Sequence, residues 1–122
     1  MTYNLPVTST YYPVCATPAN ELTQGPTGNN LVYLGGTAAN VQPFDLATYN
    51  SYDCCALCFQ TPGCLGSNYA AAYGDTSCEL EITTDATCPA NQGGNAGLYT
   101  EDSTAAFGTT FSNGPCGTFL YQ

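Results

Sequence analysis

The stretch that decides the fold is YDCCALCFQTPGCLGSNYAAAYGDTSCELEI, residues 52–82, which holds five of the eight cysteines. The spacings of these cysteines suit a helix pinned to a β-hairpin. An even number of cysteines, at several times ordinary usage, is typical of domains that are secreted into an oxidising compartment and stabilised by disulfide bonds. The chain of 122 residues therefore predicts one disulfide-rich domain, secreted and extracellular, over residues 1–122.

The helix in this stretch has recognisable start and stop signals. Asn50 is a good N-cap residue, and the carboxylate of Asp53 suits the positive end of a helix. Pro62-Gly63 ends the helical pattern. We therefore expect a helix from about Ser51 to Gln60.

The helix cysteines are expected to form disulfides rather than a metal or redox site. Cys54 and Cys58 lie four residues apart on one helix face, whereas Cys55 is turned by about 100° and reaches a different partner. A redox motif from Cys55 to Cys58 would lack a basic group to lower the thiol pKa. Zinc would need a second cysteine pair at ligand spacing, which Cys54, Cys64, Cys78 and Cys88 do not supply.

A β-hairpin follows the helix, with strands over residues 65–69 and 78–82 and a turn-like segment over residues 70–77. Apolar and charged residues alternate in the second strand, so one set is expected to face the core and the other to face water. The core set is Cys78, Leu80 and Ile82, and the water set is Glu79 and Glu81.

Elsewhere in the chain, β-favouring runs predict further strands, joined by loops rich in Gly, Pro and Asn. The expected strands are Val7–Tyr12, Leu31–Leu34, Leu98–Tyr99, Thr109–Phe111 and Phe119–Tyr121. Residues 37–47, which contain Pro43, are expected to form a connecting loop. The first residues lack the basic and apolar regions of a signal peptide, so we expect the numbering to begin on a processed chain.

The charge composition narrows the possible partners. The sequence contains no Lys, Arg or His and carries a formal net charge of −9. Nucleic acid and anionic membranes need cationic side chains to neutralise their phosphates, so both are excluded as direct partners. A neutral glycan or an extracellular protein remains, and the low density of charge also permits self-association.

The same composition argues against an enzyme. Without His, Lys or Arg, the chain has no nucleophile-activating relay and no cationic clamp, so we expect no catalytic residues and no cofactor. Glu79 and Glu81 have the spacing of a solvated strand face rather than of a glycosidase pair. Four hard oxygen ligands, none in an EF-hand pattern, are taken as a scattered acidic surface rather than a calcium site. They are Asp75, Asp85, Glu101 and Asp102.

The helix and hairpin together resemble the PAN/apple family. The family hallmark is a helix bearing C-x3-C, a cysteine just past the helix and a strand written C-x-L, which here are Cys54, Cys58, Cys64 and Cys78-Glu79-Leu80. The match covers about residues 31–100, and residues 112–117, SNGPCG, look like PAN-like secreted proteins of filamentous fungi. The resemblance implies an α+β module in which an antiparallel sheet of about five strands cradles one helix.

The resemblance also implies a nested pairing, Cys54 with Cys78 and Cys58 with Cys64. Four cysteines fall outside that pattern. Two of them flank the module, so we expect Cys15 to pair with Cys116 and tie the two arms together, and Cys55 to pair with Cys88. Eight cysteines allow many connectivities, so this second pair of bridges depends on position in the chain alone.

PAN modules mediate adhesion by binding proteins or carbohydrates, so the resemblance implies recognition of a neutral glycan or a protein at a cell surface or wall. The alternative is a structural extracellular protein that assembles into a coat, matrix or fibre. For a recognition module, the hairpin is the expected ligand-binding region, because loops on a stapled scaffold are preferred binding positions. Tyr69 and Tyr73 would stack on the ligand and Asp75 would accept hydrogen bonds, whereas core packing is the alternative for each tyrosine.

Overall fold

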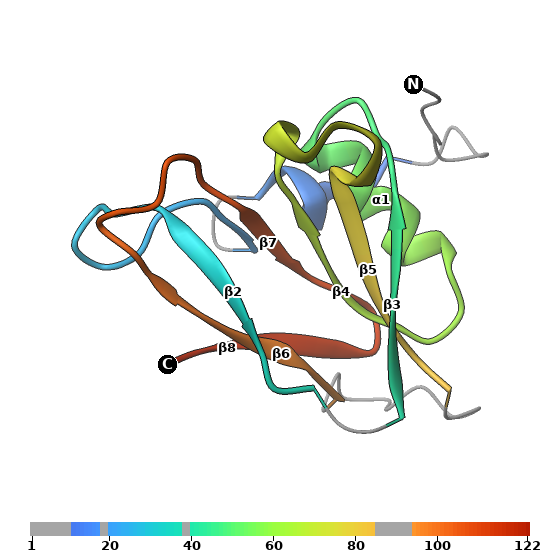
Figure 1. Cartoon of the computed structure of the whole chain (residues 1–122). Helices are drawn as coiled ribbons and strands as arrows, with labels where there is room; N and C mark the ends of the chain where they lie inside the picture. The colour runs from blue at the N-terminus through green and yellow to red at the C-terminus, as the bar shows by residue number, and fades with distance from the viewer. Residues whose placement is uncertain (1–10, 18–19, 38–39, 85–93) are drawn as a thin grey trace.

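The computed structural model describes residues 11–17, 20–37, 40–84 and 94–122 (Figure 1). Within these ranges the chain forms one α-helix, two short 3-10 helices and eight strands. In order they are η1 (Pro13–Ala16), β1 (Glu21–Leu22), β2 (Leu31–Gly35), β3 (Val41–Leu46), α1 (Ser51–Gln60), β4 (Cys64–Tyr69), η2 (Ala71–Thr76), β5 (Cys78–Thr83), β6 (Gly94–Glu101), β7 (Thr110–Asn113) and β8 (Gly117–Tyr121).

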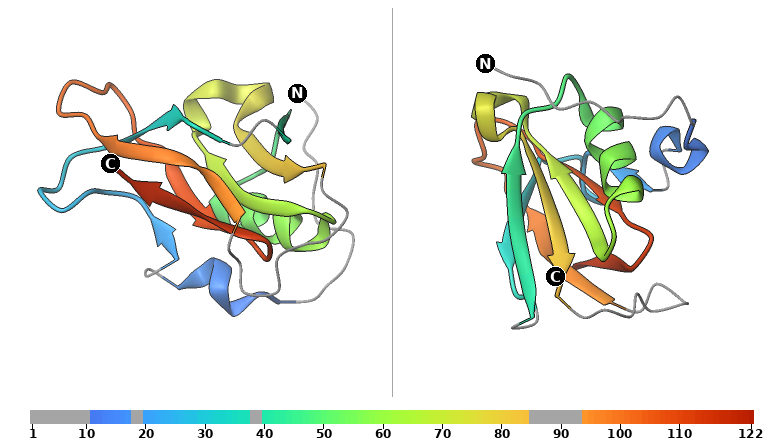
Figure 2. Two further views of the ribbon diagram at one scale, coloured as in Figure 1. Left: turned by 90° about the horizontal axis from the view of Figure 1, so that it is seen from below. Right: turned by 90° about the vertical axis from the view of Figure 1, so that its right-hand side faces the viewer.

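The strands of the described residues make two sheets. The larger sheet has the order β1-β7-β4-β5-β3 with antiparallel neighbours throughout. The smaller sheet has the order β2-β6-β8, and its β6-β8 pair is parallel. Helix α1 lies on one side of the larger sheet and the smaller sheet lies on the other (Figure 2). The expected disulfide-rich α+β class with a five-stranded antiparallel sheet is confirmed, and the smaller sheet is an addition that the sequence did not predict.

Helix α1 has the predicted bounds for the predicted reasons. The Asn50 side chain accepts a hydrogen bond from the Asp53 backbone N–H at 2.8 Å. After the helix, Gly63 adopts a φ of 80°, in the left-handed region that favours glycine, and a Cβ there would lie 2.9 Å from the Thr83 carbonyl oxygen. The chain can therefore turn sharply from α1 into β4.

The hairpin and most of the other predicted strands are confirmed. Strands β4 and β5 pair antiparallel, with Tyr69 opposite Cys78. The strand predicted over Val7–Tyr12 is wrong for its described part, since Tyr11 and Tyr12 lie in no strand, and its other residues lie outside the described ranges. The loop predicted over residues 37–47 is also wrong, because β3 occupies most of it. The loop was predicted because of Pro43. Proline is tolerated on an edge strand, and β3 is an edge of the larger sheet.

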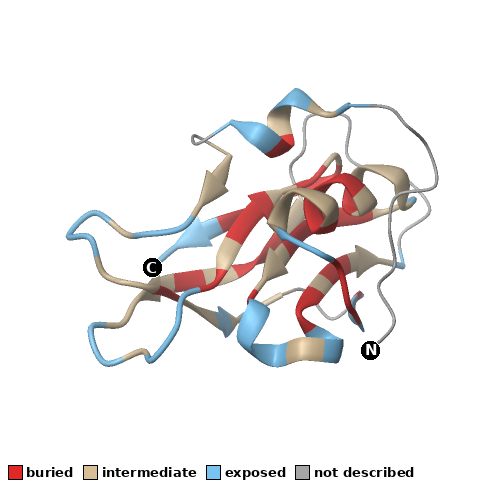
Figure 3. Cartoon of the chain, turned by 90° about the horizontal axis from the view of Figure 1, so that it is seen from above, coloured by how far each residue is buried: buried red, intermediate tan, exposed pale blue. Residues whose placement is uncertain are grey.

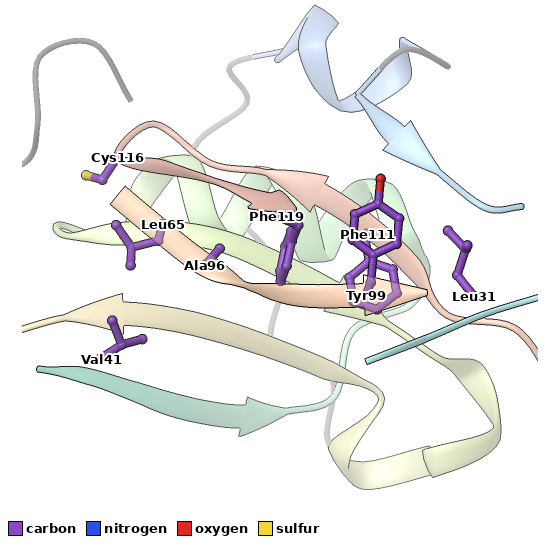
Figure 4. Close-up of a cluster of buried hydrophobic side chains, with 8 residues drawn as sticks. All are labelled: Leu31, Val41, Leu65, Ala96, Tyr99, Phe111, Cys116 and Phe119. Atoms are coloured by element: carbon purple, nitrogen blue, oxygen red, sulfur yellow. The ribbon is translucent and has the colours of Figure 1, made fainter. Parts of the chain in front are cut away.

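Two hydrophobic clusters fill the two sides of the larger sheet, and buried residues concentrate in α1 and the central strands (Figure 3). The cluster beneath α1 consists of Leu46, Cys54, Cys58, Cys64, Cys78 and Leu80. The cluster between the sheets consists of Leu31, Val41, Leu65, Ala96, Tyr99, Phe111, Cys116 and Phe119 (Figure 4). Phe111 is central to the second cluster, because its ring packs against three other aromatic rings.

Coverage on both sides changes the interpretation of β5. Cys78 and Leu80 face the α1 cluster as predicted, and half-buried Ile82 packs against it. The prediction that Glu79 and Glu81 face water is wrong. Glu79 is half-buried, and Glu81 is only 2% exposed because the smaller sheet covers that side of β5.

Three disulfides join described residues. The predicted bonds Cys54–Cys78 and Cys58–Cys64 are both present. The third bond joins Cys15 to Cys55, so the predicted pairings Cys15–Cys116 and Cys55–Cys88 are wrong. Cys116 is itself disulfide-bonded, and Cys88 lies outside the described residues.

The Cys15–Cys55 bond has a clear structural reason. Cys54 points toward its partner Cys78 on β5, and Cys55 projects about 100° further around the helix. On that side of α1 lies η1, which contains Cys15. The backbone N–H of Tyr12 donates a hydrogen bond to the Tyr52 hydroxyl at 3.0 Å. The ring centroids of Tyr12 and Phe59 are 5.6 Å apart. The segment that contains Cys15 is therefore anchored to the outside of α1, and the following strand β1 pairs with β7 near the C-terminus.

Candidate functional site

A cleft of about 550 Å³ lies where the two sheets, η2 and the loop between β6 and β7 come together. Its volume falls within the usual range for small-molecule sites. Four strands, one 3-10 helix and one loop contribute to its lining. The lining residues are Val32, Tyr33, Asp45, Asn68, Tyr73, Thr76, Glu79, Asp102, Ala105, Ala106, Phe107 and Thr109.

One wall of the cleft is aromatic. The rings of Tyr73 in η2 and Phe107 in the β6–β7 loop meet edge to face, with their centroids 5.2 Å apart. Tyr73 is 59% exposed and Phe107 is 40% exposed. Two large rings that contact each other and still face solvent leave apolar surface available to a ligand.

The floor of the cleft is a row of polar side chains placed by strand register. Glu79 of β5 lies opposite Asp45 of β3 and also opposite Asn68 of β4. Directly paired residues place their side chains on the same face, so the three groups lie side by side across the sheet. The Asn68 side-chain amide donates hydrogen bonds to Glu79 Oε1 at 3.3 Å and to Glu81 Oε1 at 3.4 Å.

Glu81 extends this row beneath the floor. It lies two residues after Glu79 on β5, and therefore on the same face of the sheet. Asn68 Nδ2 lies within 3.4 Å of both Glu79 Oε1 and Glu81 Oε1, so these two carboxyls are close together, and Asp45 lies opposite Glu79 on the neighbouring strand. We call Asp45, Glu79 and Glu81 the carboxyl cluster. Two carboxyl groups held this close together repel each other when both are ionised, which favours a proton on one of them.

Burial and mutual repulsion give the three carboxyls of the cluster different pKa values. Burial, together with the hydrogen bond and charge of Glu79, raises the pKa of Glu81 to about 9. The same causes raise the pKa of Asp45 to about 6. Burial also acts to raise the pKa of Glu79, but hydrogen bonds from Glu81, Asp45 and Asn68 outweigh it and hold that pKa below its usual value. Glu79 is therefore the most acidic member of the cluster, and in neutral solution Glu81 keeps its proton.

Tyr33 covers the carboxyl cluster from the smaller sheet. Burial raises the pKa of its phenol, and the nearby charges of Glu81 and Glu79 raise it further. The Tyr33 hydroxyl donates a hydrogen bond to the Ala96 carbonyl oxygen at 3.1 Å, and its ring packs against Phe111 and Phe119. The same ring therefore lines the cleft and belongs to the core between the sheets.

A second carboxylate stands at the rim of the cleft. Asp102 Oδ1 accepts hydrogen bonds from the Thr104 hydroxyl at 2.6 Å and the Thr104 backbone N–H at 2.9 Å. These bonds hold the pKa of Asp102 below its usual value. The Asp102 backbone N–H also donates to the Asn30 carbonyl oxygen at 2.9 Å, which ties the β6–β7 loop to the chain just before β2.

The predicted ligand residues are only partly brought together. Tyr73 lines the cleft, but Tyr69 packs against the α1 cluster, and its hydroxyl donates to the Tyr49 carbonyl oxygen at 3.2 Å. Asp75 is exposed and is not part of the lining. Sequence reasoning missed Asp45, Asn68, Tyr33 and Phe107. The only available signal was the period of two on β4 and β5, which placed Asn68 and Tyr69 on opposite faces.

Among the described residues, no group of three or more His, Cys, Asp or Glu side chains is arranged to hold a metal ion. Asp85, one of the acidic residues weighed for calcium, lies outside the described ranges. In that part of the chain, no helix is both long and apolar enough to cross a membrane. No protein-family model, curated protein or solved structure matches this chain.

Proposed function

We propose that this protein is a secreted, non-catalytic recognition module that binds a neutral carbohydrate in the cleft between its two sheets. The observation that carries the proposal is the meeting of an aromatic wall, Tyr73 and Phe107, with a polar floor, Asp45, Asn68 and Glu79. An aromatic ring presents a flat apolar face to a sugar ring, and the floor oxygens accept hydrogen bonds from sugar hydroxyls.

The charge of the chain supports a neutral ligand. No Lys, Arg or His is available to pair with a phosphate, sulfate or carboxylate, and the cleft itself carries carboxylates. An anionic ligand would therefore meet repulsion without compensation. The absence of those three residue types also supports a non-catalytic role, since the usual proton relays cannot be built.

The wider biological setting is part of the same proposal. A small domain with three disulfides between described residues is compatible with an extracellular location, where a glycan-binding module serves adhesion to a cell surface or wall. Membership of the PAN/apple family stays a prediction.

The proposal is tested by titrating the protein with four soluble neutral oligosaccharides, cellohexaose, chitohexaose, laminarihexaose and mannohexaose, in a calorimeter. We expect at least one to bind, and we expect Tyr73→Ala and Phe107→Ala each to weaken it at least about tenfold, as removal of an aromatic contact does. Binding should change little with salt, because the contacts are not ionic.

A matched control is Tyr11→Ala. Tyr11 is 63% exposed, like Tyr73, but it stacks on Tyr52 of α1, on the opposite side of the larger sheet from the cleft. This variant should bind as the parent does. If the parent, Tyr73→Ala and Phe107→Ala all bind the glycan with equal affinity while folded, the cleft is not the binding site.

A second candidate function is self-assembly into an extracellular coat, matrix or fibre. It is favoured by large apolar side chains exposed on strands that form sheet edges among the described residues. These are Leu34 on β2, Phe44 on β3 and Leu120 on β8. Edge strands with apolar side chains promote strand pairing between molecules. Light scattering separates the two candidates, because assembly predicts a mass that rises with concentration and without any glycan.

A further inference from the structure

The carboxyl cluster has no cation to balance it. Every titratable group found to act on Glu81 is an acid: Glu79 on its own strand, Asp45 on β3 and Tyr33 on β2. Strand β4 contributes only the neutral Asn68 amide. The sequence offers no Lys, Arg or His that could be placed there.

A buried carboxyl without a cationic partner is stabilised by binding a proton, because an unpaired buried charge is expensive. Glu81 is 2% exposed, and its carboxyl is close to that of Glu79, because the Asn68 amide lies within 3.4 Å of both. Loss of the proton would leave adjacent negative charges between two packed sheets. The repulsion would act on the floor of the cleft and on Tyr33, which covers it.

We propose that the proton held by Glu81 beside Glu79 acts as a pH-sensitive latch, which stabilises the packing of the two sheets and the cleft floor in acidic and neutral solution and is lost in alkaline solution. The effect on the latch itself is independent of any ligand. Its consequence for binding, a loss of affinity in alkaline solution, rests on the function proposed above.

The sign of the pH dependence follows from which state binds more protons. The pKa of Glu81 is about 9 in the folded chain, against an ordinary 4.5. Between these values the folded state holds a proton that the unfolded state has lost, so stability falls as pH rises. One such proton lowers the folded-to-unfolded ratio by about tenfold per pH unit. The groups with lowered pKa, Glu101 and Asp102, change stability only in the acidic range, and Asp45 completes its change near pH 6.

The test is urea unfolding, followed by tyrosine fluorescence, at pH 6.5, 7.5 and 8.5. We expect the folded-to-unfolded ratio of the parent protein to fall about tenfold per pH unit. In Glu81→Gln, which keeps the shape but cannot ionise, we expect that fall to disappear. Asp75→Asn, which removes an exposed carboxyl outside the cluster, should keep the parent's pH dependence. A parent ratio that is constant over this range overturns the latch.

A measurement on the parent protein alone covers the case in which Glu81→Gln does not fold. The carboxyl carbon of Glu81, followed by NMR, should titrate above pH 7. Titration below pH 5 overturns the proposal.

The two proposals fail separately. If none of the four oligosaccharides binds while stability still falls with pH, the glycan function is wrong and the latch stands. If a glycan binds equally well at pH 6.5 and 8.5 and stability is constant, the latch is wrong and the glycan function stands.

Discussion

The two faces of the larger sheet belong to the same strands, but they are covered in different ways. On one face, Cys54–Cys78 and Cys58–Cys64 attach α1 covalently. On the other face, the sheets pack through the aromatic rings around Phe111, with the carboxyl cluster beside them, and Cys116 of this packing is also disulfide-bonded. The helix face is thus held by two disulfides, and the opposite face carries the cleft and the proposed sensitivity to pH.

The largest expected loss of stability comes from a substitution in the aromatic packing between the two sheets. Phe111→Ala should lower the free energy of unfolding by about 3–5 kcal/mol, because this fully buried ring contacts Tyr33, Tyr99 and Phe119. Urea unfolding measures the change, and Phe111→Leu should cost clearly less. Glycan binding should be lost along with stability, since Tyr33 also lines the cleft. A loss below about 1 kcal/mol would show that the sheets are not held by this ring.

Removing one disulfide from the helix face should cause a somewhat smaller loss of stability. Cys54→Ala combined with Cys78→Ala should cost about 2–4 kcal/mol, mainly by freeing the unfolded chain. At temperatures where the variant is folded, glycan affinity should stay within about twofold of the parent, because the bond lies on the face opposite the cleft. A large loss of affinity in this folded variant would break the distinction between the faces. The pair Cys15→Ala and Cys55→Ala, which detaches only the N-terminal arm, is the control.

The cap of α1 tests how far local signals stabilise the helix face. Asn50→Ala should lower the free energy of unfolding by about 1 kcal/mol, since it removes the acceptor for the Asp53 N–H. Asn50→Asp keeps an acceptor at that atom and should retain most of the stability. If both variants lose the same amount, the side chain at this position contributes something other than the cap.

The smallest expected effect lies at the end of β6, away from both faces. Glu101 accepts hydrogen bonds from the Thr27 N–H and hydroxyl, the Asn29 N–H and the Tyr121 hydroxyl, and the Thr27 hydroxyl bond is the main cause of its lowered pKa. Glu101→Gln should speed amide hydrogen exchange at Thr27 and Asn29 and leave β5 unchanged. Because the pKa of Glu101 is lowered, the parent should show the same local loosening as pH falls through that lowered pKa. Unchanged exchange at both amides would contradict this.

The helix face was largely predictable, and the reason is local. The start of α1 depends on Asn50 and its end on Pro62-Gly63, and the hairpin follows within a few residues. The cleft was not predictable to the same extent, because its lining comes from β2, β3, β4, β5, η2 and the β6–β7 loop. Of the three residues predicted to bind ligand, only Tyr73 lies in it. Tyr69 is the neighbour of Asn68 on β4 and therefore faces the opposite side.

By itself, the sequence determined the helix, the hairpin, two of the three disulfides between described residues and the lack of any cation to bind an anionic partner. The helix, the hairpin and the charge depend on residue type and on spacings of a few positions, whereas the resemblance to the PAN/apple family implied the two disulfide pairings. Only the tertiary structure decided that Cys15 meets Cys55, that β3 forms an edge and that Glu81 is buried. The alternation in β5 shows that Glu81 and Leu80 face opposite sides, but what covers each side depends on segments far away in the chain. The smaller sheet covers the side of Glu81, and with no cation in the chain, a proton balances its charge.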